Sequence, residues 1–158
     1  MSASCERDVA KGAIAGAVGG LVASFIMTQF QEAVKKPQRR SEDPATVKVA
    51  NAVSEKVRSR WLTRREKGPA GSAVHYLFGT AMGSLYGAMA EAAPTARMGA
   101  GTLFGSVLWF LADEVAVPKF GLSKSPGEYP VENHVSAWAS HLIYGMTTDL
   151  VRRGLRAI

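Results

Sequence analysis

Two histidines stand seven residues apart in an otherwise apolar stretch, His134 and His141 in "HVSAWASHLIYG". Seven residues is close to two turns of an α-helix, so both imidazole rings are expected on one face. A histidine can bind or release a proton near neutral pH, and an ionisable group inside a membrane helix is a functional candidate by default. The pair therefore marks a candidate site for proton chemistry.

Two carboxylates, Asp113 and Glu114, lie near the end of the preceding apolar segment, and His75 lies near the start of an earlier one. Helices that cross a membrane in alternating directions would bring these positions to one membrane face. The polar intramembrane candidates are His75, Asp113, Glu114, His134 and His141. They predict either a proton path, with the two acids at its mouth, or purely structural roles. In the structural case the acids end a helix at the headgroups and His141 bonds a backbone carbonyl across a helix contact.

Four apolar segments must position these side chains. The first, Gly12 to Phe30, has nineteen residues and no charge, about the length needed to cross a hydrocarbon core of roughly 30 Å. We predict an all-α, polytopic membrane protein that forms a single domain over residues 1–158. About four transmembrane helices are expected, near residues 10–31, 72–91, 97–117 and 133–152. The alternative is a soluble all-α domain with unusually buried helices rich in alanine and glycine.

Glycine spacing supports the membrane interpretation. Glycine weakens a helix in water, but small residues at four-residue steps let helix backbones approach closely in a bilayer. The predicted helix-packing residues are Gly12, Gly16, Gly20, Gly79, Gly83, Gly87, Gly101, Gly105 and Gly145. The spacing predicts tight contacts, and leaves open whether they form within one chain or between chains.

The positive charge is concentrated between the first two apolar segments. The net charge is +6, and eleven of the 19 Lys and Arg lie between Lys35 and Lys67. An amphipathic helix is expected at about residues 44–65, with Asp43 as its N-cap. It either lies on the membrane surface, in contact with anionic lipid headgroups, or packs on the helix bundle. The membrane-surface candidates are Lys56, Arg58, Arg60 and Trp61. No recognition motif accompanies the charges, so we expect no nucleic acid partner.

The sequence does not indicate catalytic, metal-binding or cofactor-binding chemistry. The single cysteine excludes an internal disulfide framework. The glycine-rich stretches lack the Lys-Ser/Thr ending of a phosphate-binding loop, and no nucleophile motif is present. The spacing of histidines and acids matches no metal-ligand motif. We therefore expect no catalytic residues, no metal, no cofactor and no enzymatic activity.

The stretch "ADEVAVPKFGLSKSPGEYPVENHVSAWASHLIYGMTTDLVRRGLR" resembles the C-terminal part of the YagU-like bacterial inner-membrane proteins, a domain of unknown function. The shared features include a Pro before a Glu-Asn pair, the stretch from Ser136 to Leu142, and an arginine ending at Arg152 and Arg153. His75 and His141 match positions of the family pattern. The resemblance implies a multi-pass protein of the bacterial inner (cytoplasmic) membrane, in a family linked to acid resistance. The basic first loop has no counterpart there.

Together these features predict a small inner-membrane protein of the YagU-like kind with a proton- or pH-linked role. The alternative is a structural accessory subunit that packs by its glycine faces against a larger respiratory or photosynthetic complex. The expected partners are the lipid bilayer with its anionic headgroups, and either further copies of the chain or a larger membrane complex.

Overall fold

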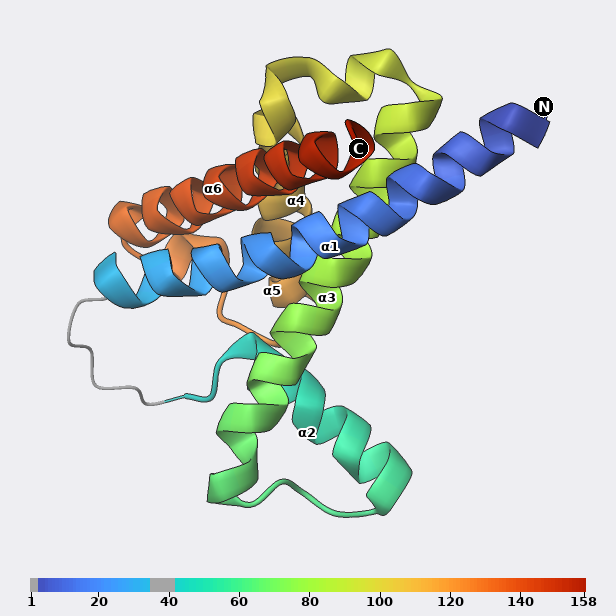
Figure 1. Cartoon of the computed structure of the whole chain (residues 1–158). Helices are drawn as coiled ribbons and strands as arrows, with labels where there is room; N and C mark the ends of the chain where they lie inside the picture. The colour runs from blue at the N-terminus through green and yellow to red at the C-terminus, as the bar shows by residue number, and fades with distance from the viewer. Residues whose placement is uncertain (1–2, 35–41) are drawn as a thin grey trace.

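The computed structural model describes residues 3–34 and 42–158, and every regular element in these ranges is helical (Figure 1). The prediction of an all-α fold is confirmed. Part of the basic loop, residues 35–41, lies outside the described residues. In chain order the elements are α1 (Ala3–Val34), α2 (Ala45–Arg58), α3 (Arg64–Ala92), the 3₁₀ segment η1 (Pro94–Gly101), α4 (Thr102–Trp109), the π-helix η2 (Phe110–Ala116), α5 (Val117–Lys119), the 3₁₀ turn η3 (Pro126–Glu128) and α6 (Val131–Arg156).

The centre of the fold is α1, which packs between α3 and α6 and runs antiparallel to both (Figure 1). The start of α1 meets the end of α3, where Gly12 lies against Glu91. The same start meets the end of α6, where Asp8 lies 3.3 Å from Arg156. On its other side α6 packs against α4.

The contact between α1 and α3 is made by glycine backbones. Gly12, Gly16 and Gly20 lie against Gly87, Gly83 and Gly79, respectively. A Cβ atom on Gly16 would lie 2.8 Å from the Cα atom of Gly87, closer than side chains tolerate. A second glycine contact joins Gly101 and Gly105 of the η1–α4 segment to α6 at Gly145 and His141. These glycine contacts form within one chain.

The buried core is small and lies beside the first glycine contact. It consists of Ala23, Met27 and Tyr144, with Met82, Phe104 and Leu108 packed against it. The hydroxyl of Tyr144 donates a 2.5 Å hydrogen bond to the carbonyl of Gly79, which satisfies a polar atom in apolar surroundings. The core therefore fixes α6 against α1 and α3.

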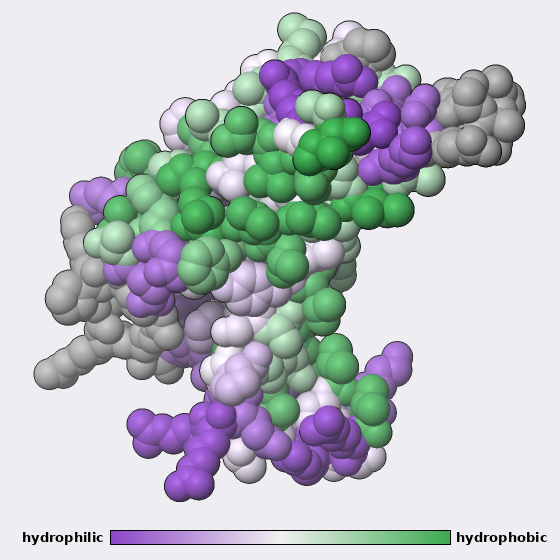
Figure 2. Space-filling view, in the orientation of Figure 1, coloured by the Kyte–Doolittle hydropathy of each residue, from purple (hydrophilic) through white to green (hydrophobic). Residues whose placement is uncertain are grey.

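Within residues 3–34 and 42–158, two helices, not the four expected, are long and apolar enough to cross a membrane: Asp8–Val34 and Thr95–Lys119. The other two segments were overestimated because Gly, Ser, Thr, Tyr and His lower their mean hydropathy, although residues 72–90 carry no charged side chain. Helix α3 begins with "RREK", and α6 contains Glu132, Asp149, Arg152 and Arg153. Figure 2 shows an apolar surface across the middle of the molecule, with hydrophilic surface above and below it.

The predicted amphipathic helix ends earlier than expected. Helix α2 stops at Arg58 and not near residue 65, because Ser59 adopts a left-handed backbone with φ of 52°. The turn that follows is held by buried polar atoms of α2. The side chain of Asn51 accepts a hydrogen bond from the backbone N–H of Leu62 at 3.1 Å, and the Ser54 hydroxyl donates to the carbonyl of Arg60 at 2.9 Å.

Candidate functional site

The candidate site is built on the π-helix η2, which carries Asp113 and Glu114. Its wider turn is visible in the hydrogen bond from the N–H of Val117 to the carbonyl of Ala112, five residues earlier. Pro118 supplies a local cause, since its ring would clash with the carbonyl of Glu114 in a regular α-helix. Single π-turns inside α-helices are frequent at functional sites. Here the π-turn directs both acids towards α6.

Glu114 pairs with His134, near the start of α6. Nδ1 of His134 lies 2.6 Å from the Glu114 carboxylate, and Nε2 lies 3.0 Å from the carbonyl oxygen of Pro126. Both partners are hydrogen-bond acceptors when Glu114 is ionised, so the imidazolium form of His134 donates both hydrogen bonds at once. The ring of Tyr129 covers the pair edge-on, with its centroid 6.4 Å from that of His134. This geometry holds a proton between a carboxylate and an imidazole.

Asp113 faces His141, two turns further along α6. The Asp113 carboxylate lies 3.8 Å from Nδ1 of His141, and that nitrogen donates a 2.9 Å hydrogen bond to the carbonyl of Ala137. The carbonyl belongs to the helix of His141 itself and not to a neighbouring helix. Since Nδ1 carries the hydrogen, Nε2 is the atom that can take up a further proton. His141 is buried, whereas Asp113 is partly exposed.

His75 approaches the same region from α3. Its Nε2 atom lies 3.4 Å from the carbonyl oxygen of Ser24 on α1, and its ring meets that of Tyr76 edge-on. The structure therefore brings together two acid–histidine pairs at the contact of η2 with α6, and it places His75 at the contact of α3 with α1. No group of three or more His, Cys, Asp or Glu within residues 3–34 and 42–158 could hold a metal ion.

Both paired histidines face the same partner, the helix formed by α4 and η2. Between them on α6, the indole N–H of Trp138 donates a 3.0 Å hydrogen bond to the hydroxyl of Ser106 on α4. Next along the helix, Gly105 lies against the backbone of His141. The glycine contact thus sets the distance between the acids and the histidines.

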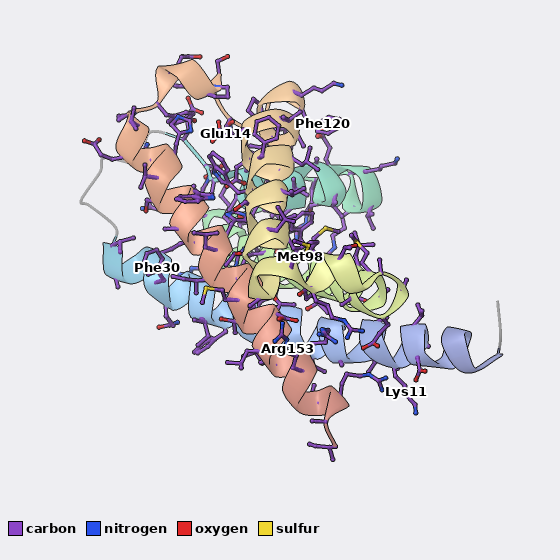
Figure 3. The ribbon with its side chains drawn as sticks, turned by 90° about the horizontal axis from the view of Figure 1, so that it is seen from above. Lys11, Phe30, Met98, Glu114, Phe120 and Arg153 are labelled. Carbon is purple, nitrogen blue, oxygen red and sulfur yellow. The ribbon has the colours of Figure 1, made fainter. Side chains whose placement is uncertain are left out.

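A second charged cluster lies at the other end of the bundle, and the sequence analysis missed it. Asp149, Arg152, Arg153 and Arg156 share one face of α6 by their spacing, and they meet Glu91 of α3 and Arg97 of η1. The i, i+3, i+4, i+7 spacing was a readable signal for the α6 members. Nothing in the sequence pointed to Glu91. Figure 3 shows Glu114 and Arg153 towards opposite ends of the bundle.

The membrane-surface candidates divide between α2 and the turn after it. Lys56 and Arg58 lie in the last turn of α2, whereas Arg60 and Trp61 follow the helix. Arg60 binds Glu66 through two hydrogen bonds of 2.9 and 2.7 Å. These bonds, with two from Thr63, hold the pKa of Glu66 well below its usual range and raise the pKa of Arg60. Arg60 is therefore tied to the start of α3.

Helix α2 packs on α3 through a mixed face of two apolar and two polar residues. Its buried residues are Val47, Ala50, Asn51 and Ser54. An apolar stripe points away from the protein, with Val57 on α2 75% exposed and Trp61, in the turn after α2, 65% exposed. Packing on the bundle and an outward apolar stripe therefore occur together on one helix.

Comparison with known proteins gives one match. A family model described as "Protein of unknown function (DUF1440)" matches residues 35–150. The matched range contains both acid–histidine pairs and His75. No curated protein and no solved structure matches the chain.

Proposed function

The chain belongs to the DUF1440 family of proteins of unknown function, and we propose that it is a small multi-pass membrane protein with a proton-linked role. The observation that carries the proposal is the pair of acid–histidine contacts on the π-helix. The proposed membrane-spanning segments are the two apolar helices, Asp8–Val34 and Thr95–Lys119.

The outward faces of the bundle support the membrane location. Large apolar side chains point away from the protein on every long helix, including Leu77 at 70% exposed and Leu150 at 72% exposed. The buried residues, by contrast, include the ionised groups Asp149 and Arg152 and several glycines. Large continuous apolar surfaces are rare on soluble monomers. Lipid is the environment in which such a distribution is favourable, because the outward side chains leave water.

The two acid–histidine pairs support the proton-linked role. Glu114 and His134 lie near the end of the Thr95–Lys119 span, beside the loop that contains Pro126. Asp113 and His141 lie further into the bundle. The outer pair is Glu114 with His134, and the inner pair is Asp113 with His141. Both pairs lie in the contact of η2 with α6, so a proton bound at the outer pair has the inner pair nearby to receive it. We propose that the outer pair takes up the proton and the inner pair accepts it.

The resemblance to the YagU-like proteins supplies a setting for this chemistry. That family is linked to acid resistance at the bacterial inner membrane, where a proton gradient is present. Groups that bind a proton at the membrane surface would respond to acidification on that side. We propose that this chain acts there in an acid-dependent way.

The alternative function, an accessory subunit of a larger complex, relied on free glycine faces. These faces are occupied within the chain, by contacts of α1 with α3 and of the η1–α4 segment with α6. The alternative therefore keeps only the outward apolar surface in its favour, and lipid covers that surface equally well.

The first experiment tests membrane location and autonomy. Native membranes are washed with alkaline carbonate, extracted in mild detergent and separated on a native gel, with mass spectrometry of the band. We expect the chain to stay with the washed membranes and to migrate alone or as a few copies. Release by carbonate would refute membrane integration, and migration at a fixed ratio with a large assembly would favour the accessory subunit.

The second experiment tests the proton-linked role. The full chain is reconstituted in vesicles that contain a pH-sensitive dye, and proton entry is followed after an external acid step. We expect Glu114→Gln and His141→Phe to slow proton entry at least about tenfold, because each removes a protonatable member of a pair. The controls are Glu132→Gln, an exposed acid in the first turn of α6, and Lys124→Ala in the preceding loop.

Circular dichroism of each reconstituted variant shows whether the helices are intact. If the unmodified chain admits protons no faster than empty vesicles, the proton-linked role is wrong. It is also wrong if folded Glu114→Gln and Glu132→Gln variants behave alike.

A further inference from the structure

A cavity of about 520 Å³ lies at the end of the bundle remote from the histidines. It is a shallow depression, largely open to the outside, and it is lined by Glu91, Arg97, Arg152, Arg153, Arg156 and Ala157. Four of these six residues are arginines, and one is an acid. The surface shows this cluster as a hydrophilic patch where η1 meets the end of α6 and the start of α1 (Figure 2).

One carboxylate, that of Glu91, pairs with three of the guanidinium groups. Oε1 of Glu91 accepts hydrogen bonds from Arg152 and Arg156, both at 3.1 Å, and Oε2 lies 3.4 Å from Arg97. A guanidinium has five N–H donors, whereas a carboxylate has two oxygens. Glu91 is not their only acceptor, because Arg156 also pairs with Asp8 and Arg97 also donates to the carbonyl of Ala90. With Asp149 counted, four arginines face three carboxylates, which leaves an excess of one positive charge in the cluster.

The arginines are held in place from behind the cavity. Asp149 is 1% exposed and pairs with Arg152 at 3.0 Å and with Arg153 at 2.7 Å. The guanidinium carbon of Arg152 also lies 6.0 Å from the centroid of the Tyr86 ring, within range of a cation–π contact. These contacts fix the guanidinium planes before a ligand arrives, which lowers the entropic cost of binding.

We propose that this arginine pocket binds a phosphate group. Guanidinium groups match the oxygens of a phosphate through parallel hydrogen bonds, and several of them around one cavity favour a multiply hydrogen-bonded anion. Two sources carry this chemistry: the headgroup of an anionic phospholipid, and free phosphate. The pocket lies beside the start of the Asp8–Val34 span and the start of the Thr95–Lys119 span. In a membrane this position is at the interface, where basic pockets meet lipid headgroups.

The test uses the full chain, purified in a detergent without charge, and two probes. One is phosphatidylglycerol, added in mixed micelles and followed by native mass spectrometry with phosphatidylcholine as competitor. The other is inorganic phosphate, followed by isothermal titration against sodium chloride at equal ionic strength. Retention of phosphatidylglycerol over phosphatidylcholine identifies a lipid headgroup, and heat of binding with inorganic phosphate identifies the free anion.

The variants separate the pocket from general positive charge. Arg97→Gln and Arg156→Gln each remove donors from the lining, and each is expected to weaken binding of the retained probe about tenfold, or ~1.4 kcal/mol. The matched control is Arg65→Gln, an exposed residue in the first turn of α3, which removes the same charge far from the pocket and is expected to leave binding unchanged. Circular dichroism excludes unfolding as the cause.

Arg97→Lys adds a second criterion, because it keeps the charge and loses the planar fork. Partial weakening is expected, between the values for the unmodified chain and for Arg97→Gln. The proposal is wrong if neither probe binds. It is also wrong if Arg65→Gln weakens binding as much as the pocket variants, or if the folded pocket variants bind as well as the unmodified chain.

Discussion

Replacing Gly16 by alanine tests whether the backbones of α1 and α3 touch. An added Cβ atom would lie 2.8 Å from the Cα atom and 2.9 Å from the N atom of Gly87, whereas ordinary contacts begin at 3.4 Å. The helices must therefore separate by at least about 0.6 Å at this position. No side chain can move aside to relieve the contact, since both neighbouring atoms are backbone.

The expected change in the free energy of unfolding follows from two opposing effects. Overpacking of this kind costs up to about 3 kcal/mol. Alanine regains about 1 kcal/mol over glycine inside a helix. We therefore expect Gly16→Ala to lower the free energy of unfolding by about 2 kcal/mol. The control is Gly154→Ala, an exposed position in α6, where the added Cβ would meet nothing within 4 Å. There only the helix preference acts, and a gain of about 0.5–1 kcal/mol is expected.

The assay is unfolding of the purified full chain in mild-detergent micelles by stepwise addition of sodium dodecyl sulfate, followed by circular dichroism. The two variants should shift the midpoint in opposite directions. A Gly16→Ala midpoint equal to or above that of the unmodified chain would refute the backbone contact. Equal losses in both variants would show that the loss does not come from the contact between α1 and α3.

Two further predictions concern ionised groups. Asp149→Asn removes the buried partner of Arg152 and Arg153 and should cost about 3 kcal/mol in the same titration. The control is Asp8→Asn, because the carboxylate of Asp8 is half-exposed beside Arg156. This substitution should cost at most about 0.5 kcal/mol. Similar losses in the two variants would contradict the burial of Asp149. The depressed pKa of Glu66 means that its stabilising bonds are complete above about 4.5, its pKa in the unfolded chain, and are lost as pH falls towards the folded value. Protection factors of the amide hydrogens at the start of α3, which correct for the intrinsic pH dependence of exchange, should therefore fall through this acidic range, and this fall should vanish in Glu66→Gln.

The parts of the fold that follow from local pattern could be predicted from the sequence. The all-α class follows from long apolar segments without strand alternation. The three-glycine repeats of α1 and α3 predicted close helix contacts, since four-residue steps place small residues on one face. The number of membrane-spanning helices was overestimated, because the long stretches within α3 and α6 also contain Gly, Ser, Thr, Tyr and His, which lower their mean hydropathy.

The features missed depend on geometry that sequence pattern does not encode. The stretch "FLADEVA" reads as ordinary helix, and only Pro118 hints at the π-turn that directs Asp113 and Glu114 towards α6. The end of α2 rests on a serine with positive φ, a conformation that sequence usually signals by glycine or asparagine. Glu91 meets Arg152 across 61 positions of sequence. Contacts of that range are set by packing, and one sequence gives no sign of them.

The glycine contacts also imply an order of assembly during synthesis. Each helix that is apolar enough to enter a bilayer unaided precedes the less apolar helix that packs on its glycines: Asp8–Val34 precedes α3, and Thr95–Lys119 precedes α6. The earlier helix can therefore settle first and present a ready backbone surface to the later one. In the proposed membrane setting, the charged ends of α3 and α6 would join partners already in place, so neither helix would have to insert by its own apolarity.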